Sequence, residues 1–143
     1  MKLEEIPRLN TNTALKIPTI CHQESIGQKV DVGIGIVGID GSILASSKSE
    51  KMNPCLYDFA KFKAQTSCFK GVSTEELPAR NGQNLEIIDM GKLKVIRAVK
   101  GGIPIYYNGK VVGAISVSGA NPDIDKMIAP IRIEGMEELT DKK

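Results

Sequence analysis

The sequence predicts a single antiparallel α+β domain, and three observations carry this prediction. Its 143 residues are 41% hydrophobic and 25% charged, which is the balance of an ordinary globular domain. The expected elements follow the order helix, hairpin, long helix, three strands and helix, without an alternating strand–helix array. The dipeptides Asp40-Gly41 and Asn108-Gly109 are typical of tight turns between antiparallel strands. We expect one domain over residues 1–143, with irregular ends at 1–8 and 140–143.

The first third of the chain predicts a helix and a hairpin. Asparagine and threonine residues from position 10 onward suit the start of a helix that ends near Gly27. Pro18 would either kink this helix or delay its start. Residues 30–37 are rich in β-branched side chains and glycine, which predicts a strand, and a second strand returns over 42–46.

A long helix is expected next, because Asn53 suits its N-cap, Pro54 its first position and Gly71 its end. One face of this helix collects all three phenylalanines of the chain at helical spacing, together with a cysteine and a threonine: Cys55, Phe59, Phe62, Thr66 and Phe69. We expect this face to pack against the sheet.

Three strands and a helix complete the expected order. Ser73 and Glu76 form a capping box that starts a short helix, and a loop follows over 78–91. Asn121 and Pro122 suit the start of a C-terminal helix. Strands are predicted over three ranges: 92–99, 103–107 and 110–118.

Charge and cysteine usage exclude several classes of function. The net charge is +2 and the basic residues are scattered, which argues against a nucleic-acid partner. Cys21, Cys55 and Cys68 are odd in number and form no C-x-x-C pair, so we expect buried free thiols rather than a disulfide or a zinc site. The sequence lacks the apolar core of a signal peptide and an apolar run of about 20 residues. We expect a cytoplasmic protein with no membrane or metal partner.

One motif fits a cofactor fingerprint but lies in the wrong context. Residues 33–38, GIGIVG, match G-x-G-x-x-G, the dinucleotide-binding pattern. That site requires a helix N-terminus directly after the glycines, to hold the pyrophosphate, whereas a hairpin turn follows here. Gly33 and Gly35 share one face of the strand, so we expect a helix to pack closely on them, with the floor of a pocket as the alternative.

Three stretches occur together in an order that is informative: VDVGIGIVGIDGSILAS, YDFAKFKAQTS and GGIPIYYNGKVVGAISVSGANPDID. Over residues 9–130 the chain resembles the GlcG/HbpS-like family, also called the haem-degrading domain family, which includes PduO C-terminal domains and OrfY-type proteins. The resemblance implies a profilin-like fold, in which an antiparallel five-stranded sheet lies between helices. It also implies homo-oligomers, and some members of the family bind haem.

The match to the family's motifs can be given residue by residue. The middle motif, D-x-A-x-x-K-A-x-T-A, falls on Asp58, Ala60, Lys63, Ala64 and Thr66. The two later motifs, GG-x-P and G-V-S-G followed by an aspartate, fall on Gly101, Gly102, Pro104, Gly109, Gly113, Val117, Ser118, Gly119 and Asp125. The chain departs from the pattern at Gly38, where relatives carry aspartate, and at residues 48–50, where Lys-Ser-Glu replaces Arg-Met-Asp.

The resemblance also points to a candidate ligand residue. His22 is the only histidine of the chain and lies on the expected first helix, where PduO-type domains carry a haem-ligating histidine. The alternative is a surface or packed histidine without a ligand. A single histidine excludes a multi-histidine metal site.

A second group of candidates surrounds the Gly101-Gly102 turn. Lys63 could bind a carboxylate or phosphate or act as a base, and the turn could form an anion-binding nest, with a tight connection as the alternative. Ser116 and Ser118 could add hydroxyl groups to the same pocket. We therefore expect an oligomeric small-ligand-binding accessory protein with haem or another tetrapyrrole as the candidate ligand. The alternative is a small enzyme that uses Lys63 and the Gly101-Gly102 turn on a carboxylate or carbonyl metabolite.

Overall fold

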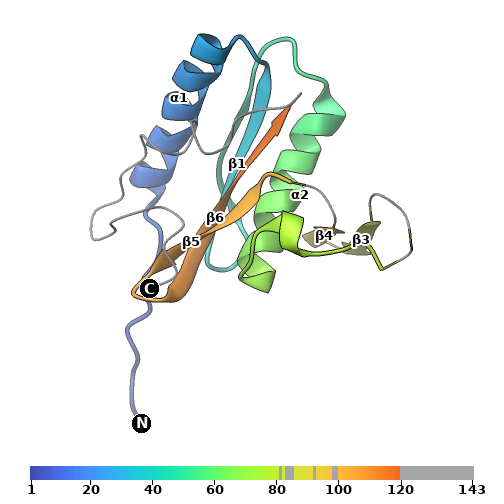
Figure 1. Ribbon diagram of the computed structural model, residues 1–143. Helices are drawn as coiled ribbons and strands as arrows, with labels where there is room; N and C mark the ends of the chain where they lie inside the picture. Colours follow the sequence, from blue (N-terminus) through green and yellow to red (C-terminus); the bar gives the residue numbers. More distant parts are fainter. Residues whose placement is uncertain (81, 83–85, 92, 98–99, 120–143) are drawn as a thin grey trace.

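The computed structural model describes residues 1–80, 82, 86–91, 93–97 and 100–119. Nine elements follow one another along this part of the chain (Figure 1): α1 (Thr11–Gln28), β1 (Val32–Gly38), β2 (Ile43–Lys48), α2 (Pro54–Lys70), the 3₁₀ turn η1 (Thr74–Glu76), β3 (Glu86–Met90), β4 (Leu93–Arg97), β5 (Gly102–Tyr107) and β6 (Lys110–Gly119). The C-terminal helix expected from Asn121 lies outside the described residues.

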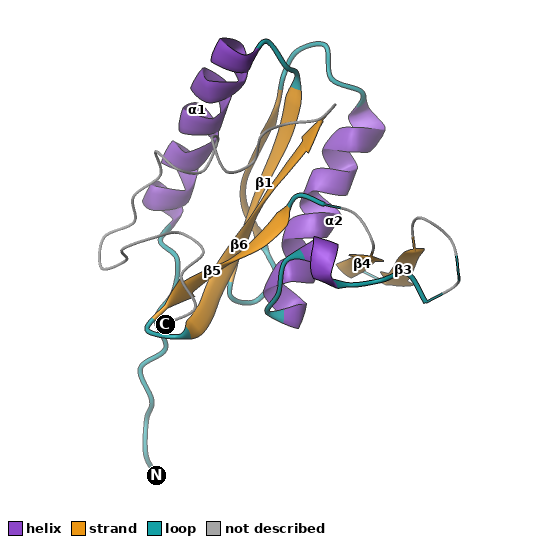
Figure 2. Cartoon of the chain, in the orientation of Figure 1, coloured by secondary structure: helices purple, strands orange, loops and turns teal. Residues whose placement is uncertain are grey.

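The main sheet has four antiparallel strands in the order β2-β1-β6-β5, and α1 and α2 cover its two faces (Figure 2). The predicted antiparallel α+β class is confirmed. In the described part of the chain the main sheet has four strands rather than the five that the resemblance implied, because β4, the strand predicted over 92–99, pairs with β3 in a separate two-stranded ribbon. Residues 86–90 were expected to be loop, yet they pair with β4 across a tight turn in which Gly91 has a φ of +81°.

Both long helices begin and end where local chemistry predicts. The Asn10 side chain accepts a hydrogen bond from the Thr13 amide at the start of α1, and Pro18 lies buried inside the helix. The Asn53 side chain accepts from the Cys55 amide at the start of α2, which ends at Gly71 with a φ of +72°. The three cysteines are free, as predicted, but only Cys21 is buried, whereas Cys55 is exposed.

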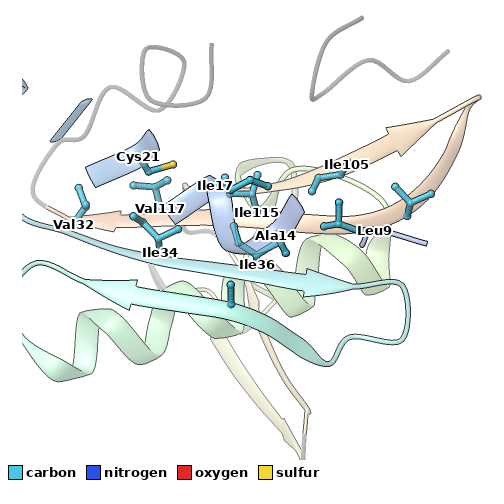
Figure 3. Packing of buried hydrophobic residues seen from close by; sticks show 12 residues of the cluster. Leu9, Ala14, Ile17, Cys21, Val32, Ile34, Ile36, Ile105, Ile115 and Val117 are labelled. Carbon is cyan, nitrogen blue, oxygen red and sulfur yellow. The ribbon is translucent and has the colours of Figure 1, made fainter. Parts of the chain in front are cut away.

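The face of the sheet covered by α1 is an aliphatic core (Figure 3). Its members come from the segment that leads into α1, from α1 itself and from all four strands: Leu9, Ala14, Ile17, Cys21, Val32, Ile34, Ile36, Ala45, Ile105, Val112, Ile115 and Val117. Branched side chains alternate along β1 and meet the buried stripe of α1, which drives the helix onto this face.

The other face packs by backbone proximity, and here the phenylalanine prediction is wrong. Phe69 is 60% exposed and Phe59 and Phe62 are only half-buried, whereas α2 buries Ala60, Lys63, Ala64, Gln65, Thr66 and Ser67. A Cβ on Gly35 would lie 3.2 Å from the Ala60 carbonyl oxygen, so the helix backbone rests almost on the strand. Phenylalanine is too large for this contact. The prediction that a helix packs closely on Gly33 and Gly35 is confirmed.

Candidate functional site

The candidate residues divide between the two faces of the sheet. His22 belongs to α1, whereas Lys63 belongs to α2 and lies with Gly101 and Gly102 on the opposite face. Ser118 pairs with Gly33 in the sheet register and therefore shares the α2 face. A ligand that contacts His22 from its own side of the sheet cannot also contact Lys63.

A pocket of about 590 Å³ opens beside His22, within the size range of small-molecule sites. It lies between the C-terminal end of α1, the connection to β1, and the end of β2. Its lining residues are His22, Ser25, Ile26, Lys29, Val30, Asp31, Ser47, Lys48, Ser49 and Glu50. Residues 48–50, where the chain departs from the resembled family's Arg-Met-Asp, are therefore part of this pocket.

The His22 imidazole is half-buried and held by a partner on β2. Its Nε2 lies 2.8 Å from the Ser47 Oγ, and the Ser25 Oγ donates a 2.8 Å hydrogen bond to the His22 carbonyl oxygen. Burial lowers the pKa of His22 from its usual range, because removing water disfavours the charged ring. The imidazole is therefore neutral near pH 7, which is the form that ligates metals.

Residues of both charge signs line the pocket. Lys29 and Lys48 are basic, and Asp31 and Glu50 are acidic. The Lys48 Nζ donates to the carbonyl oxygens of Ser49 and Glu50, at 3.3 and 3.1 Å. Ile26 is 76% exposed and adds an apolar residue to the lining. The lining thus combines a neutral imidazole with basic, acidic and apolar residues.

The two departures from the family pattern, at residues 48–50 and at Gly38, lie at opposite ends of β1. The Ser49 Oγ accepts from the Val32 amide at 2.8 Å, and the Ser49 amide donates to the Val32 carbonyl at 2.7 Å, so Ser49 fastens the pocket wall to β1. Gly38 lies at the far end of β1, where its amide donates to the Ser42 carbonyl in the hairpin turn. Gly38, where relatives carry aspartate, is therefore not part of the His22 pocket.

Lys63 is buried, with 3% of its surface exposed, and its ammonium is engaged by backbone. The Lys63 Nζ donates to the carbonyl oxygens of Lys100 and Val117, at 2.9 and 3.3 Å. Burial lowers the pKa of Lys63 to about 8. Gly101 has a φ of +126°, and a Cβ there would lie 2.4 Å from the Val117 carbonyl oxygen and 2.7 Å from the Lys63 Nζ. Only glycine fits at this position.

The Gly101-Gly102 turn is a tight connection, and the anion-nest prediction is not supported by its geometry. The Gly102 amide donates to the Thr74 Oγ1 at 3.0 Å, and the turn region directs carbonyl oxygen toward the Lys63 ammonium. Ser116 and Ser118 are buried on this face, and within the described part of the chain the Ser116 Oγ has no hydrogen-bond partner. The bonds of Thr74 and Lys63 link the turn region to η1 and α2.

Sequence reasoning missed two residues that the structure makes prominent. Ser47 contacts His22 although 25 positions separate them, and a serine in a polar strand carries no local signal for this role. Thr66 was placed on the phenylalanine face and in the family's middle motif without a contact of its own, yet its Oγ1 accepts from the Ile96 amide at 2.8 Å and links β4 to α2. Among the described residues no group of three or more potential ligands could hold a metal ion, and no helix is long and apolar enough to cross a membrane.

Comparison with known proteins identifies the family. The family model described as haem-degrading protein, HbpS-like, matches residues 9–133. Among curated proteins, the chain is 25% identical over 140 residues to the uncharacterised 15.0 kDa protein in the dhaT-dhaS intergenic region of Citrobacter freundii. That alignment covers 96% of this chain and 99% of the relative.

Three solved structures share the fold. A double mutant of Streptomyces reticuli HbpS has a TM-score of 0.74 at 23% identity, covering 94% of this chain and 92% of that one. Klebsiella pneumoniae ORFY has a TM-score of 0.72 at 18% identity, covering 92% and 91%. The PduOC:haem complex has a TM-score of 0.71 at 19% identity, covering 94% and 99%. These likenesses show that the α+β architecture is that of HbpS.

Proposed function

The chain belongs to the HbpS-like family, and from this premise we propose that it is an accessory protein that binds a small ligand in the His22 pocket. Haem or another tetrapyrrole is the candidate ligand, by analogy with the relative crystallised as a haem complex. The observation that carries the proposal is the neutral, half-buried imidazole of the only histidine, at the wall of a pocket of about 590 Å³.

The donor set of the pocket suits a tetrapyrrole. A neutral imidazole nitrogen is a ligand for haem iron, and His22 supplies it. The Lys29 ammonium can pair with a carboxylate side arm, and the Lys48 ammonium can do so once it leaves its two backbone carbonyl contacts. Ile26 and Val30 offer apolar contact to a flat ring. A bound haem would supply an iron that the His22 nitrogen could ligate. The chain's own residues would orient it and neutralise its carboxylates.

The alternative enzyme uses Lys63 and remains a prediction. A pKa of about 8 suits a general base, which favours this reading chemically. However, the ammonium is buried and donates to two carbonyl oxygens, so a substrate would have to displace both contacts. The burial of Lys63 and the open pocket at His22 together favour His22 as the ligand site.

Self-association and a cytoplasmic location complete the proposal. Large apolar side chains on α2 and β3 are exposed in the single chain, namely Leu56, Phe69, Ile87 and Met90. An interface between copies would cover surface of this kind. Light scattering of the purified protein measures its mass, and a monomer at every concentration would contradict self-association.

Titration with ferric haem tests the ligand directly. We expect a shifted Soret band on binding, and we expect His22→Ala to reduce the affinity at least tenfold, because the axial nitrogen is lost. Gln23→Ala is the matched control, since Gln23 is the exposed next residue of the same helix. A Soret band and affinity that are identical in parent and His22→Ala proteins would reject ligation by His22.

A further inference from the structure

The hydrogen bond between His22 and Ser47 joins two elements at the wall of the pocket. His22 lies on α1 and Ser47 on β2, and the 2.8 Å distance from Nε2 to Oγ is that of a well-formed bond. Ser47 pairs with Ile34 in the sheet, so its side chain shares the α1 face with the aliphatic core. The imidazole is thus fixed from the side of β2.

Either tautomer of the ring leaves Nε2 occupied. If Nδ1 carries the proton, the Nε2 lone pair accepts from the Ser47 hydroxyl. If Nε2 carries the proton, that N–H donates to the Ser47 oxygen and no lone pair remains. A ligand that reacts through Nε2 must therefore first break the bond to Ser47.

We propose that Ser47 is a positioning residue that controls how readily His22 Nε2 reaches any electrophile or metal centre in the pocket. The inference rests on the proposed function only for the identity of the ligand. Because a hydrogen bond between neutral groups contributes modestly to a net equilibrium, its removal should change the availability of Nε2 by about 2- to 10-fold. The hydroxyl lowers availability and holds the ring in one orientation.

The chain offers a matched set of variants. Ser47→Ala removes the hydroxyl, and Ser47→Thr retains it with a side chain that suits a strand. Ser46→Ala is the control, because Ser46 precedes Ser47 on β2 but its Oγ contacts the Tyr57 hydroxyl at 2.6 Å on the other face. His22→Ala sets the background, since the chain has one histidine.

The first measurement is the rate at which diethyl pyrocarbonate acylates the imidazole of the protein without added ligand. We expect Ser47→Ala to react about 2- to 10-fold faster than the parent, with Ser47→Thr and Ser46→Ala close to the parent. Equal rates in the parent and Ser47→Ala proteins would overturn the inference. Thermal unfolding of the same variants shows whether a faster rate comes from a loosened fold, which would also overturn it.

Ferric haem titration of the same variants separates this inference from the proposed function. If haem binds through His22, we expect tighter binding by Ser47→Ala by a similar factor. If haem binds no variant while acylation is faster in Ser47→Ala, the proposed ligand is wrong and the control by Ser47 stands. If haem binds through His22 and acylation is unchanged in Ser47→Ala, the proposed function stands and the inference is wrong.

Discussion

The two faces of the main sheet are packed by opposite means. On the α1 face, branched side chains such as Ile34 and Ile36 fill the space between helix and sheet. On the α2 face, Gly33 and Gly35 remove side chains altogether, and the backbone of α2 comes close to β1. One strand supplies both surfaces, because its successive residues point to opposite sides.

This difference decides where each face can carry chemistry. Side chains hold α1 away from the strands, and the last turns of α1 border an open pocket with His22 in its wall. Because α2 lies close to the sheet, its polar side chains hydrogen-bond to the backbone of neighbouring segments. Thr66 accepts from the Ile96 amide, and Lys63 donates to the Lys100 carbonyl oxygen. The α1 side therefore has an open pocket beside its helix, whereas polar side chains of the α2 side hydrogen-bond to backbone.

The largest loss of stability is expected when side-chain volume is removed from the α1 face. We expect Ile34→Ala to lower the free energy of unfolding by about 2–5 kcal/mol, because the side chain is fully buried and its loss leaves a cavity. Chemical denaturation measures this change. A loss below about 1 kcal/mol would show that α1 settles onto the strand and that this face is not held by side-chain volume.

On the α2 face, the buried charge of Lys63 predicts a pH dependence. Its folded pKa of about 8 lies below the usual value of 10.5, so between these values the unfolded chain binds more protons. Stability therefore rises with pH across this window. Relative to Lys63→Met, we expect the parent to gain about 2–3 kcal/mol between pH 8 and pH 10.5, measured by denaturation at each pH.

The Met variant is the reference because it keeps the length of the side chain and does not titrate. Subtracting its pH profile removes the contributions of the other lysines and the tyrosines. A difference that stays flat from pH 8 to pH 10.5 would show that the ammonium is as well solvated by the carbonyls of Lys100 and Val117 as by water.

The smallest loss of stability is expected when side-chain volume is added to the α2 face at Gly35. We expect Gly35→Ala to destabilise the protein by about 1–3 kcal/mol, since its new methyl group would lie 3.2 Å from the Ala60 carbonyl oxygen and the Lys61 Cα. Gly27→Ala, at a helical glycine with open space around it, is the control that should be neutral or stabilising. Equal effects at the two positions would contradict backbone packing on this face.

Local signals in the sequence were sufficient to predict both long helices and most strands, but not β3, which was expected to be loop. Asn10, Asn53 and Gly71 mark helix ends through hydrogen bonds to adjacent backbone, so their neighbours in sequence suffice to predict them. The alternation along β1 likewise predicted which residues share a face. The placement of β4 could not be predicted in this way, because its choice between β3 and the main sheet depends on distant contacts such as Thr66 with Ile96.

In the candidate site, too, contacts between distant residues could not be predicted from the neighbouring sequence. His22 was predicted from the resemblance, and nothing local indicated Ser47, which contacts it across two elements. Lys63 and the Gly101-Gly102 turn were predicted to lie together and do so, but for a different reason. The Lys63 ammonium donates to the carbonyl oxygens of Lys100 and Val117 beside the turn, and ligand binding by Lys63 and the turn stays a prediction.

The stretch GIGIVG separates what the sequence determines by itself from what depends on the tertiary structure. By itself the sequence determined that residues 33–38 form a strand before a hairpin and therefore cannot be a dinucleotide site, because hydrogen bonding between near neighbours sets turns. Only the tertiary structure decided that α2 rests on Gly33 through Tyr57 and on Gly35 through the backbone at Ala60, rather than through phenylalanine. That choice depends on the distance between two backbones, which no periodicity within either segment encodes.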